Sequence, residues 1–295
     1  MISRKFTIWA CGLLFVFGSC AEDMVKPIEN DKDAPGTVQD VKTESLPGAV
    51  KFTYTLPSDP DLLYVLAKYT NKTGKVMEFR SSFYTNSVTV EGFGDTDTYK
   101  VELYTVDRSE NRSQPQIVEV VPLTPPILSC YESLSMVSDF GGMTFEMDNK
   151  FKSDLAIYVC TLDELGDMVL AETFYSSREE IVYSVRGYDA VPRRFGIFLQ
   201  DKYGNETDTL FTELTPIYER ELDKTKFREM YLQNDSRVDS YDGKMEYVWN
   251  GRISKDGDSG GVGLHTVTGT KDGPAVFTFD LGVLAKLSRF ALWAI

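Results

Sequence analysis

Residues 50–56, Val-Lys-Phe-Thr-Tyr-Thr-Leu, alternate without a break between apolar and polar side chains. Successive side chains of a β-strand point to opposite faces of the sheet. This stretch therefore predicts a strand with one buried face and one solvated face. The alternation decides the fold class, because the same kind of pattern recurs on both sides of it.

Strand patterns continue through residues 36–124. Residues 62–69 are apolar at both parities, which predicts a central strand. Asn71-Lys72-Thr73-Gly74 supplies a hairpin turn into a strand at residues 75–83. Seven short strands in about ninety residues indicate an antiparallel sandwich. Further strands are predicted at residues 87–90, 99–106 and 116–121.

Residues 125–217 repeat this plan. The stretch from Asp107 to Ser113 recurs as Asp201 to Thr207, and Leu-Thr-Pro at 123–125 recurs at 214–216. The sequence therefore predicts a second sandwich after a short proline linker. The repeated Asp and Asn residues fit either a ligand loop or turns in which they cap their own backbone, and we favour the turns.

The pattern changes after residue 217. Phe227, Met230 and Tyr231 have helical spacing, which predicts a short amphipathic helix over residues 222–232. A loop region rich in Gly and Asp follows. Apolar alternation then predicts strands around residues 277–281 and 290–292.

These segments resemble the modules of outer-membrane lipoproteins that Bacteroidetes encode in polysaccharide-utilisation loci. In that family, two fibronectin-type-III-like domains of unassigned function precede a discoidin-like domain related to galactose-binding modules. The resemblance implies an all-β chain with two tandem fibronectin-III/Ig-like sandwiches at 36–124 and 125–217 and a discoidin-like sandwich at 218–295. We expect the last module to be incomplete, because a discoidin domain needs roughly twice that length. The matching motifs lie at residues 64–69, 89–93, 104–108, 122–126, 184–189, 195–196, 222–227, 277–282 and 287–290.

The first residues predict a lipid anchor. Arg4 and Lys5 precede an apolar run that is too short to span a bilayer, and Gly18-Ser19 stand directly before Cys20. We therefore expect a lipoprotein signal peptide at 1–19, lipidation of Cys20 and an extended tether over 20–35, with plain secretion as the alternative. Glu22-Asp23 after the cysteine resembles the signal that sends such lipoproteins to the outer face of the outer membrane.

The charge balance limits the partners that we expect for this chain, and the cysteine content limits its covalent links. Without Arg4 and Lys5, 29 of the 31 basic residues remain against 45 acidic ones, and an acidic surface repels phosphate backbones. Nucleic acid is therefore excluded as an expected partner. Cys130 and Cys160 would be the only unlipidated thiols of the mature chain, and they are either a disulfide or two small core residues.

Catalytic and metal-binding patterns are sparse. His265 is the only histidine, so a Ser/His/Asp triad would have to use it, and no phosphate-binding glycine loop stands between a strand and a helix. Asn250, Asp256 and Asp258 resemble a calcium loop, but calcium prefers six or more oxygen ligands. We therefore predict a non-enzyme with no cofactor and no metal site.

Four residues are the best candidates for sugar contact. An aromatic face stacks on the C–H groups of a sugar ring, while short polar side chains hydrogen-bond its hydroxyls. The alternative for both tryptophans is a place in the core. We predict a surface glycan-binding or glycan-uptake accessory protein; the alternative is a structural subunit that docks on an outer-membrane transporter without touching sugar. The candidates are Trp249, Asp258, His265 and Trp293.

Overall fold

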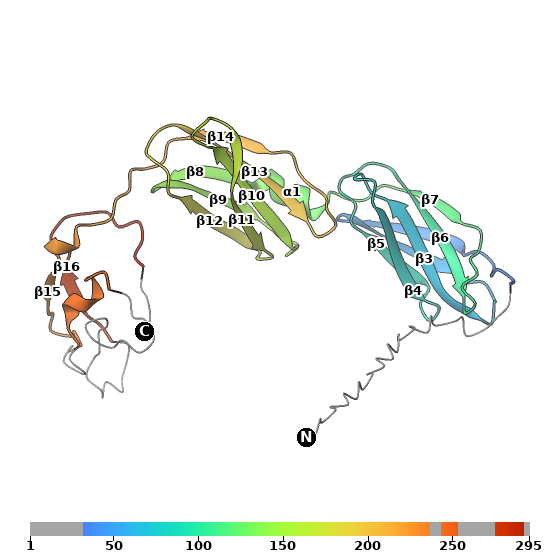
Figure 1. Ribbon diagram of the computed structural model, residues 1–295. Helices are drawn as coiled ribbons and strands as arrows, with labels where there is room; N and C mark the ends of the chain where they lie inside the picture. The colour runs from blue at the N-terminus through green and yellow to red at the C-terminus, as the bar shows by residue number, and fades with distance from the viewer. Residues whose placement is uncertain (1–31, 237–242, 253–274, 292–295) are drawn as a thin grey trace, which may run out of the picture. The chain divides into compact units, whose positions relative to one another are not determined.

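A computed structural model of the chain describes residues 32–236, 243–252 and 275–291 (Figure 1). Strands hold 48% of the described residues and helices 6%. All strand pairs between the named strands are antiparallel, within the ranges described. The predicted all-β fold of antiparallel sandwiches is therefore confirmed. The chain divides into two compact units, one up to Pro125 and one from Pro126.

The first unit is a sandwich of a three-stranded sheet, β1-β2-β5, and a four-stranded sheet, β4-β3-β6-β7. The alternating stretch forms β2, where Val50, Phe52 and Tyr54 are buried in the core and Thr53 and Thr55 are exposed. β3 lies between β4 and β6, as its apolar faces predicted. The strands are β1 (Gln39–Leu46), β2 (Ala49–Thr55), β3 (Leu62–Thr70), β4 (Val76–Ser82), β5 (Ser87–Glu91), β6 (Tyr99–Asp107) and β7 (Gln116–Val120).

The second unit repeats this arrangement after a short helix, α1 (Pro126–Ser133). Its sheets are β12-β9-β8 and β11-β10-β13-β14. Phe145 from the first sheet and Phe195 from the second are fully buried in the core that they share. Ile127 and Cys130 of α1 also belong to this core. The strands are β8 (Ser135–Asp139), β9 (Gly142–Asp148), β10 (Leu155–Leu162), β11 (Met168–Ser176), β12 (Glu180–Arg186), β13 (Arg193–Asp201) and β14 (Leu210–Leu214).

The repeated Asp/Asn segments are turns. Asp107 Oδ1 accepts the backbone N–H groups of Ser109 and Asn111, both at 2.8 Å. The second copy does the same, since Asp201 Oδ1 accepts the backbone N–H of Asn205 at 2.9 Å. In both copies the asparagine amide donates back to the aspartate Oδ2. The carboxylate thus satisfies donors within its own turn, which confirms the turn interpretation.

One position of this turn differs between the copies and gives a stability test. The backbone is left-handed at Gly204 (φ +85°) and at the equivalent Glu110 (φ +64°). Because a side chain disfavours this region by about 1–2 kcal/mol, Gly204→Ala should lower the free energy of unfolding by about 1 kcal/mol. Glu110→Gly should not lower it comparably, since it relieves the same strain. Urea titration of both variants checks this, and an equal loss in both would contradict it.

Each sandwich is closed by residues that follow its last strand. In the first, Gly48 N–H donates to Leu123 O at 3.0 Å, and Leu123 N–H donates to Leu46 O at 3.1 Å. In the second, Gly141 N–H donates to Ile217 O at 2.7 Å, and Ile217 N–H donates to Asp139 O, at the end of β8, at 2.9 Å. In both units the departing chain runs parallel to the tip of the first hairpin. The last strand alone therefore does not complete either sandwich.

The predicted helix over residues 222–232 is wrong. The segment forms a single 3-10 turn, η1 (Lys224–Lys226), which Asp223 caps by accepting the Thr225 N–H. It continues as β15 (Arg228–Met230), which pairs with β16 (Thr278–Asp280). The strand predicted at residues 277–281 thus exists in a shorter form. Residues 281–291 contain no strand, so the described part of the second predicted strand, including Phe290, is not one.

The two cysteines are free thiols in this structure. Cys130 is buried in the core beside Asn149, whereas Cys160 is half-buried on the other face of β10, among the positions that alternate with Ile157 and Val159 of the core. The structure therefore favours the alternative to a disulfide. Burial, together with the charge of Asp148, raises the pKa of Cys130 to about 11. This thiol stays protonated and unreactive at neutral pH.

Candidate functional site

Trp249 lies in a small aromatic cluster of the segment after the second sandwich. It follows a short 3-10 helix, η2 (Met245–Val248), and its backbone N–H donates to Glu246 O at 3.3 Å. Its ring centroid lies 5.8 Å from that of Phe227, edge-on, and 5.1 Å from that of Phe279 on β16. Residues far apart in sequence are thus brought together by the pairing of β15 with β16. Trp249 is held by aromatic contacts and remains partly exposed.

An open hollow of about 530 Å³ lies beside Trp249. Its wall combines two aromatic side chains with hydrogen-bonding and charged groups. The lining residues are Lys224, Thr225, Glu246, Tyr247, Trp249, Asn250 and Gly251.

The polar groups around the hollow are fixed by local contacts. Lys224 forms an ion pair with Glu221 at 2.5 Å, and this hydrogen bond lowers the pKa of the Glu221 carboxyl. Hydrogen bonds from Thr225 lower the pKa of Asp223 in the same way. Both carboxylates are therefore ionised at neutral pH. Asn250 Oδ1 accepts the Arg252 N–H at 2.8 Å, so it organises a turn at the edge of the hollow.

The structure places one of the four predicted sugar-contact residues. Trp249 lines the hollow, whereas Asp258, His265 and Trp293 lie outside the described residues. Cys20, the predicted lipidation site, also lies outside them. Of these predicted site residues, only Trp249 therefore has a structural environment that can be described.

Sequence reasoning missed the residues that share the hollow with Trp249. Lys224 and Thr225 belong to the segment that was predicted to be helical, and nothing in the sequence connects that segment with Trp249. Tyr247 carried a signal, because it stands two residues before the tryptophan in an aromatic-rich stretch. The hollow could be found only once the pairing of β15 with β16 was known.

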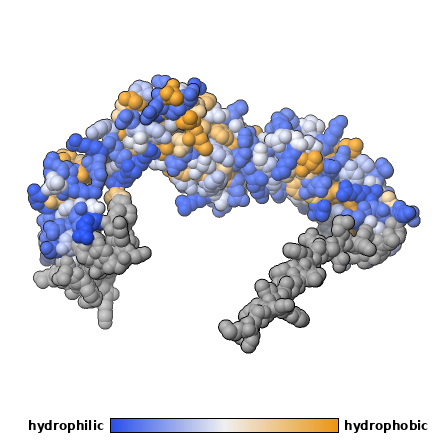
Figure 2. Space-filling model, viewed as in Figure 1, coloured by the Kyte–Doolittle hydropathy of each residue, from blue (hydrophilic) through white to orange (hydrophobic). Residues whose placement is uncertain are grey.

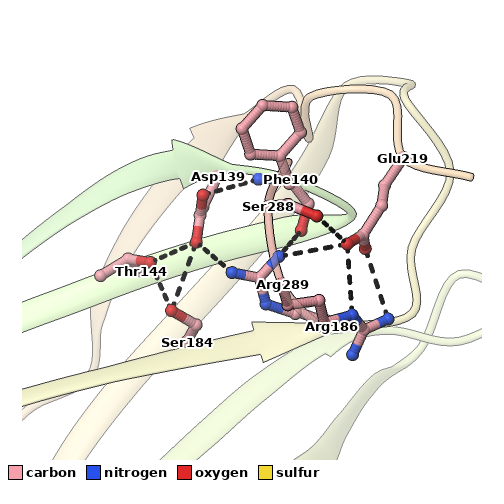
Figure 3. Close-up of polar contacts among 8 residues, drawn as sticks. All are labelled: Asp139, Phe140, Thr144, Ser184, Arg186, Glu219, Ser288 and Arg289. Carbon is pink, nitrogen blue, oxygen red and sulfur yellow. Dashed lines mark hydrogen bonds and ion pairs between the residues drawn. The ribbon is translucent and has the colours of Figure 1, made fainter. Parts of the chain in front are cut away.

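A second polar cluster joins the second sandwich to residues 288–289 (Figure 3). Glu219 Oε1 accepts a hydrogen bond from the Ser288 hydroxyl at 2.5 Å. It also forms ion pairs with Arg289 Nε at 3.2 Å and with Arg186 Nη1 at 3.5 Å. Its side chain is only 15% exposed. Glu219 thus holds a later part of the chain against the strand end that carries Arg186.

Arg186, at the end of β12, connects Glu219 to Asp139 at the end of β8 (Figure 3). Arg186 Nη2 donates to Asp139 Oδ2 at 2.9 Å, and Nη1 donates to the Phe140 carbonyl at 2.7 Å. Burial opposes ionisation of Asp139, but hydrogen bonds from Thr144 and the Phe140 N–H and the charge of Arg186 together lower its pKa. The cluster has the satisfied pairing of a structural network rather than the free groups of a catalytic site.

Other site classes are not seen in the described ranges. Residues 32–236, 243–252 and 275–291 contain no group of three or more His, Cys, Asp or Glu side chains that could hold a metal ion. No helix within the same ranges has the length and apolar character needed to cross a membrane.

Comparisons with known families match the two sandwiches. Residues 35–122 match a family model described as domain of unknown function DUF4959, and residues 123–225 match another described as domain of unknown function DUF5126. No curated protein matches the chain.

Solved structures with similar regions include one named SusE-like protein BT2857. It has 30% sequence identity and a TM-score of 0.33, and the match covers 54% of this chain and 56% of that protein. This chain thus spans just over half the length of that relative. A two-domain fibronectin type-III segment of chicken tenascin has 13% identity and a TM-score of 0.29, covering 61% of this chain and 99% of the segment. Over residues 35–225, this chain is therefore similar to two domain families of unknown function.

Proposed function

We propose that this chain is a non-catalytic accessory protein of polysaccharide utilisation, anchored to the cell surface by lipid, and that it contacts glycan at the hollow beside Trp249. One observation carries the proposal: a partly exposed indole lines an open hollow together with Tyr247, Asn250 and charged side chains. The indole offers an apolar face to the C–H groups of a sugar, and the polar wall offers partners to its hydroxyls.

The comparisons support the setting of this proposal. A protein named SusE-like shares 30% identity over about half of this chain, which fits a surface accessory role in a starch-utilisation type of system. In this proposal the sandwiches predicted at residues 36–124 and 125–217 are spacers. The segment from residue 218 is then the glycan-binding tip, and its neighbour in this proposal is an outer-membrane transporter. The predicted lipidation of Cys20 would attach the whole chain to the membrane.

The glycan site is tested by Trp249→Ala. Calorimetric titration of the full chain against a panel of soluble polysaccharides should find at least one ligand, and the variant should bind it at least tenfold more weakly, because the stacking surface is gone. Lys224→Met alters the same wall without removing a ring, and it should weaken binding less. The control is Tyr84→Ala, which removes an 84% exposed ring of the first sandwich.

Two results would contradict the glycan site. The first is a panel without any binder. The second is a Trp249→Ala variant that binds as tightly as the unaltered chain. An equal loss in the Tyr84→Ala control would move the binding site to the first sandwich instead.

The anchor is tested by Cys20→Ala. Expressed with its leader in a host that lipidates proteins, the unaltered chain should fractionate with membranes, and the variant should appear in the soluble fraction. Cys160→Ala is the matched control, since it removes a thiol that is not a predicted lipidation site. Membrane association that survives Cys20→Ala would exclude this anchor.

A further inference from the structure

The two sandwiches differ at one end, where the hairpin between the third and fourth strands of each sandwich meets a neighbouring loop. In the first sandwich this hairpin joins β3 to β4, and Lys72 at its tip forms ion pairs with Asp95 and, at 2.9 Å, with Asp97. Tyr99, at the start of β6, also donates its hydroxyl to Asp95 at 2.9 Å. Hairpin and loop are therefore tied together by a lysine between two carboxylates.

The equivalent hairpin of the second sandwich has the same backbone geometry. Asp163 N–H bonds to Asp167 O at 2.9 Å, as Asn71 N–H bonds to Lys75 O at 2.9 Å. The glycine of each hairpin also donates to the first residue of its turn. Residue for residue, Glu164 therefore takes the place of Lys72.

The neighbouring loop keeps its acid while the lysine is lost. β6 and β13 both have nine residues, so Arg193 stands at the position of Tyr99. Asp189 precedes Arg193 by four residues, as Asp95 precedes Tyr99. Glu164 and Asp189 are both exposed acids. No ion pair within 4 Å joins hairpin and loop here among the residues that the structure describes.

A hollow of about 330 Å³ lies at this end of the second sandwich. Arg193 forms part of its wall, but its guanidinium is already engaged: it donates to the Leu162 carbonyl and lies 4.8 Å from the centre of the Tyr188 ring. Leu165 at the hairpin tip is 88% exposed, and Val191 in the loop is 52% exposed. The hollow is lined by Leu162, Asp163, Glu164, Leu165, Gly166, Pro192 and Arg193.

One row on the outer face of the adjoining sheet lacks the charged residues of the equivalent row in the first sandwich. One row across the first sheet reads Lys68, Glu78, Glu102 and Ile117 in neighbouring strands. The equivalent row of the second sheet consists of Cys160, Leu170, Gly196 and Phe211.

The apolar character of that second row reaches the surface. Phe211 is 41% exposed, Leu170 on the edge strand β11 is 57% exposed, and Met168 beside the hairpin is 37% exposed. Apolar residues also reach the surface of the second sandwich in several places in Figure 2. Since the two sandwiches share one plan, the common fold does not require this difference.

We propose that hairpin 163–167, loop 188–192 and β11 form a docking surface for a segment of another protein that carries a lysine or arginine between apolar side chains. The basic group would pair with Glu164, which lines the hollow, and with the exposed Asp189 of the neighbouring loop, and the apolar neighbours would contact Leu165 and Val191. Charge favours such a partner over a second copy of this chain, whose net charge is −14. Exposed apolar side chains favour it over a neutral glycan.

The test uses the full chain with labelled Leu and Val methyl groups, observed by NMR. The probe is the blocked peptide Val-Leu-Lys-Leu-Val, compared with the same peptide carrying Glu in place of Lys. We expect the lysine peptide to shift the Leu165 and Val191 methyl signals and to bind at least tenfold more tightly than the glutamate peptide. Raising the salt concentration should weaken binding, because the charges are exposed.

The decisive variant is Glu164→Lys, which restores the lysine of the first sandwich on an exposed turn and therefore leaves the fold intact. It should reduce binding of the lysine peptide at least tenfold, whereas Glu132→Lys, an equal charge change on α1, should reduce it far less. Equal shifts with both peptides would overturn the proposal, as would unchanged binding in Glu164→Lys. Shifts of the same methyl signals by neutral oligosaccharides alone, or by raising the protein concentration alone, would assign the surface to a glycan or to self-association and overturn it as well.

Discussion

Gly142→Ala should strongly destabilise the second sandwich. A Cβ atom at this position of β9 would lie 1.8 Å from the Val185 carbonyl oxygen and 3.0 Å from the Arg186 Cα on the paired strand β12. Both are backbone atoms of β12, so no side chain can rotate away to make room. Overpacking of a well-packed interior costs about 1–3 kcal/mol and sometimes more. We expect the upper end or beyond, which is a large part of the roughly 5–15 kcal/mol that stabilises a domain.

Urea unfolding, monitored by far-ultraviolet circular dichroism, measures the loss of stability. Gly204→Ala is the matched control in the same sandwich, because its added Cβ has no heavy atom within 4 Å. Its smaller loss of stability should then come only from the unfavourable positive φ that a side chain must adopt at this position. A Gly142→Ala variant that is no less stable than Gly204→Ala would mean that β9 and β12 are not paired in this register.

Arg186→Met should have the second largest effect. It removes the cation between Asp139 and Glu219, whose side chains are 25% and 15% exposed. Losing one partner of a buried ion pair costs about 3–5 kcal/mol, and partial solvent access reduces this to about 2–3 kcal/mol. Arg80→Met is the control: Arg80 is 61% exposed and lies 3.8 Å from its carboxylate partner, so its loss should cost under about 1 kcal/mol.

The same variant should change the acid limb of stability. The pKa of Asp139 is lowered in the folded protein, so its contribution is present above the ordinary carboxyl pKa and is lost as the pH falls through the lowered value. Removing Arg186 takes away one of the interactions that lower this pKa, so the variant should lose less stability on acidification, and its loss should end at a higher pH. Unfolding free energies measured between pH 6 and 3 would show this. Parallel curves for the variant and the unaltered chain would contradict the assigned role of Arg186.

The sandwiches could be predicted from sequence because their signals are local. Alternation over residues 50–56 gives β2, and the Asp107 turn depends on contacts within five residues. The segment after residue 217 lacks such signals. The spacing of Phe227 and Met230 imitates a helix, but the backbone of 228–230 pairs with residues 278–280, about fifty positions later.

The candidate sites were beyond sequence reasoning for the same reason. The hollow at Trp249 combines residues 224–225 with residues 246–251, and only the paired strands bring aromatic partners from both regions together. The docking surface can be recognised only when equivalent positions of the two sandwiches are compared. The exchange of Lys72 for Glu164 has meaning only because both hairpins have the same hydrogen bonds.

The bonds that close each sandwich at Leu123 and Ile217 have a mechanical consequence. A chain held at one end and loaded at the other transmits tension through its backbone. In the first sandwich, that tension reaches the Leu123 bonds to Gly48 and Leu46 before it reaches β7. Because the departing chain runs parallel to the hairpin tip, the two bonds share the load in shear instead of opening one after the other. In the first sandwich these short parallel contacts would act as a mechanical clamp that protects β7 from being peeled away.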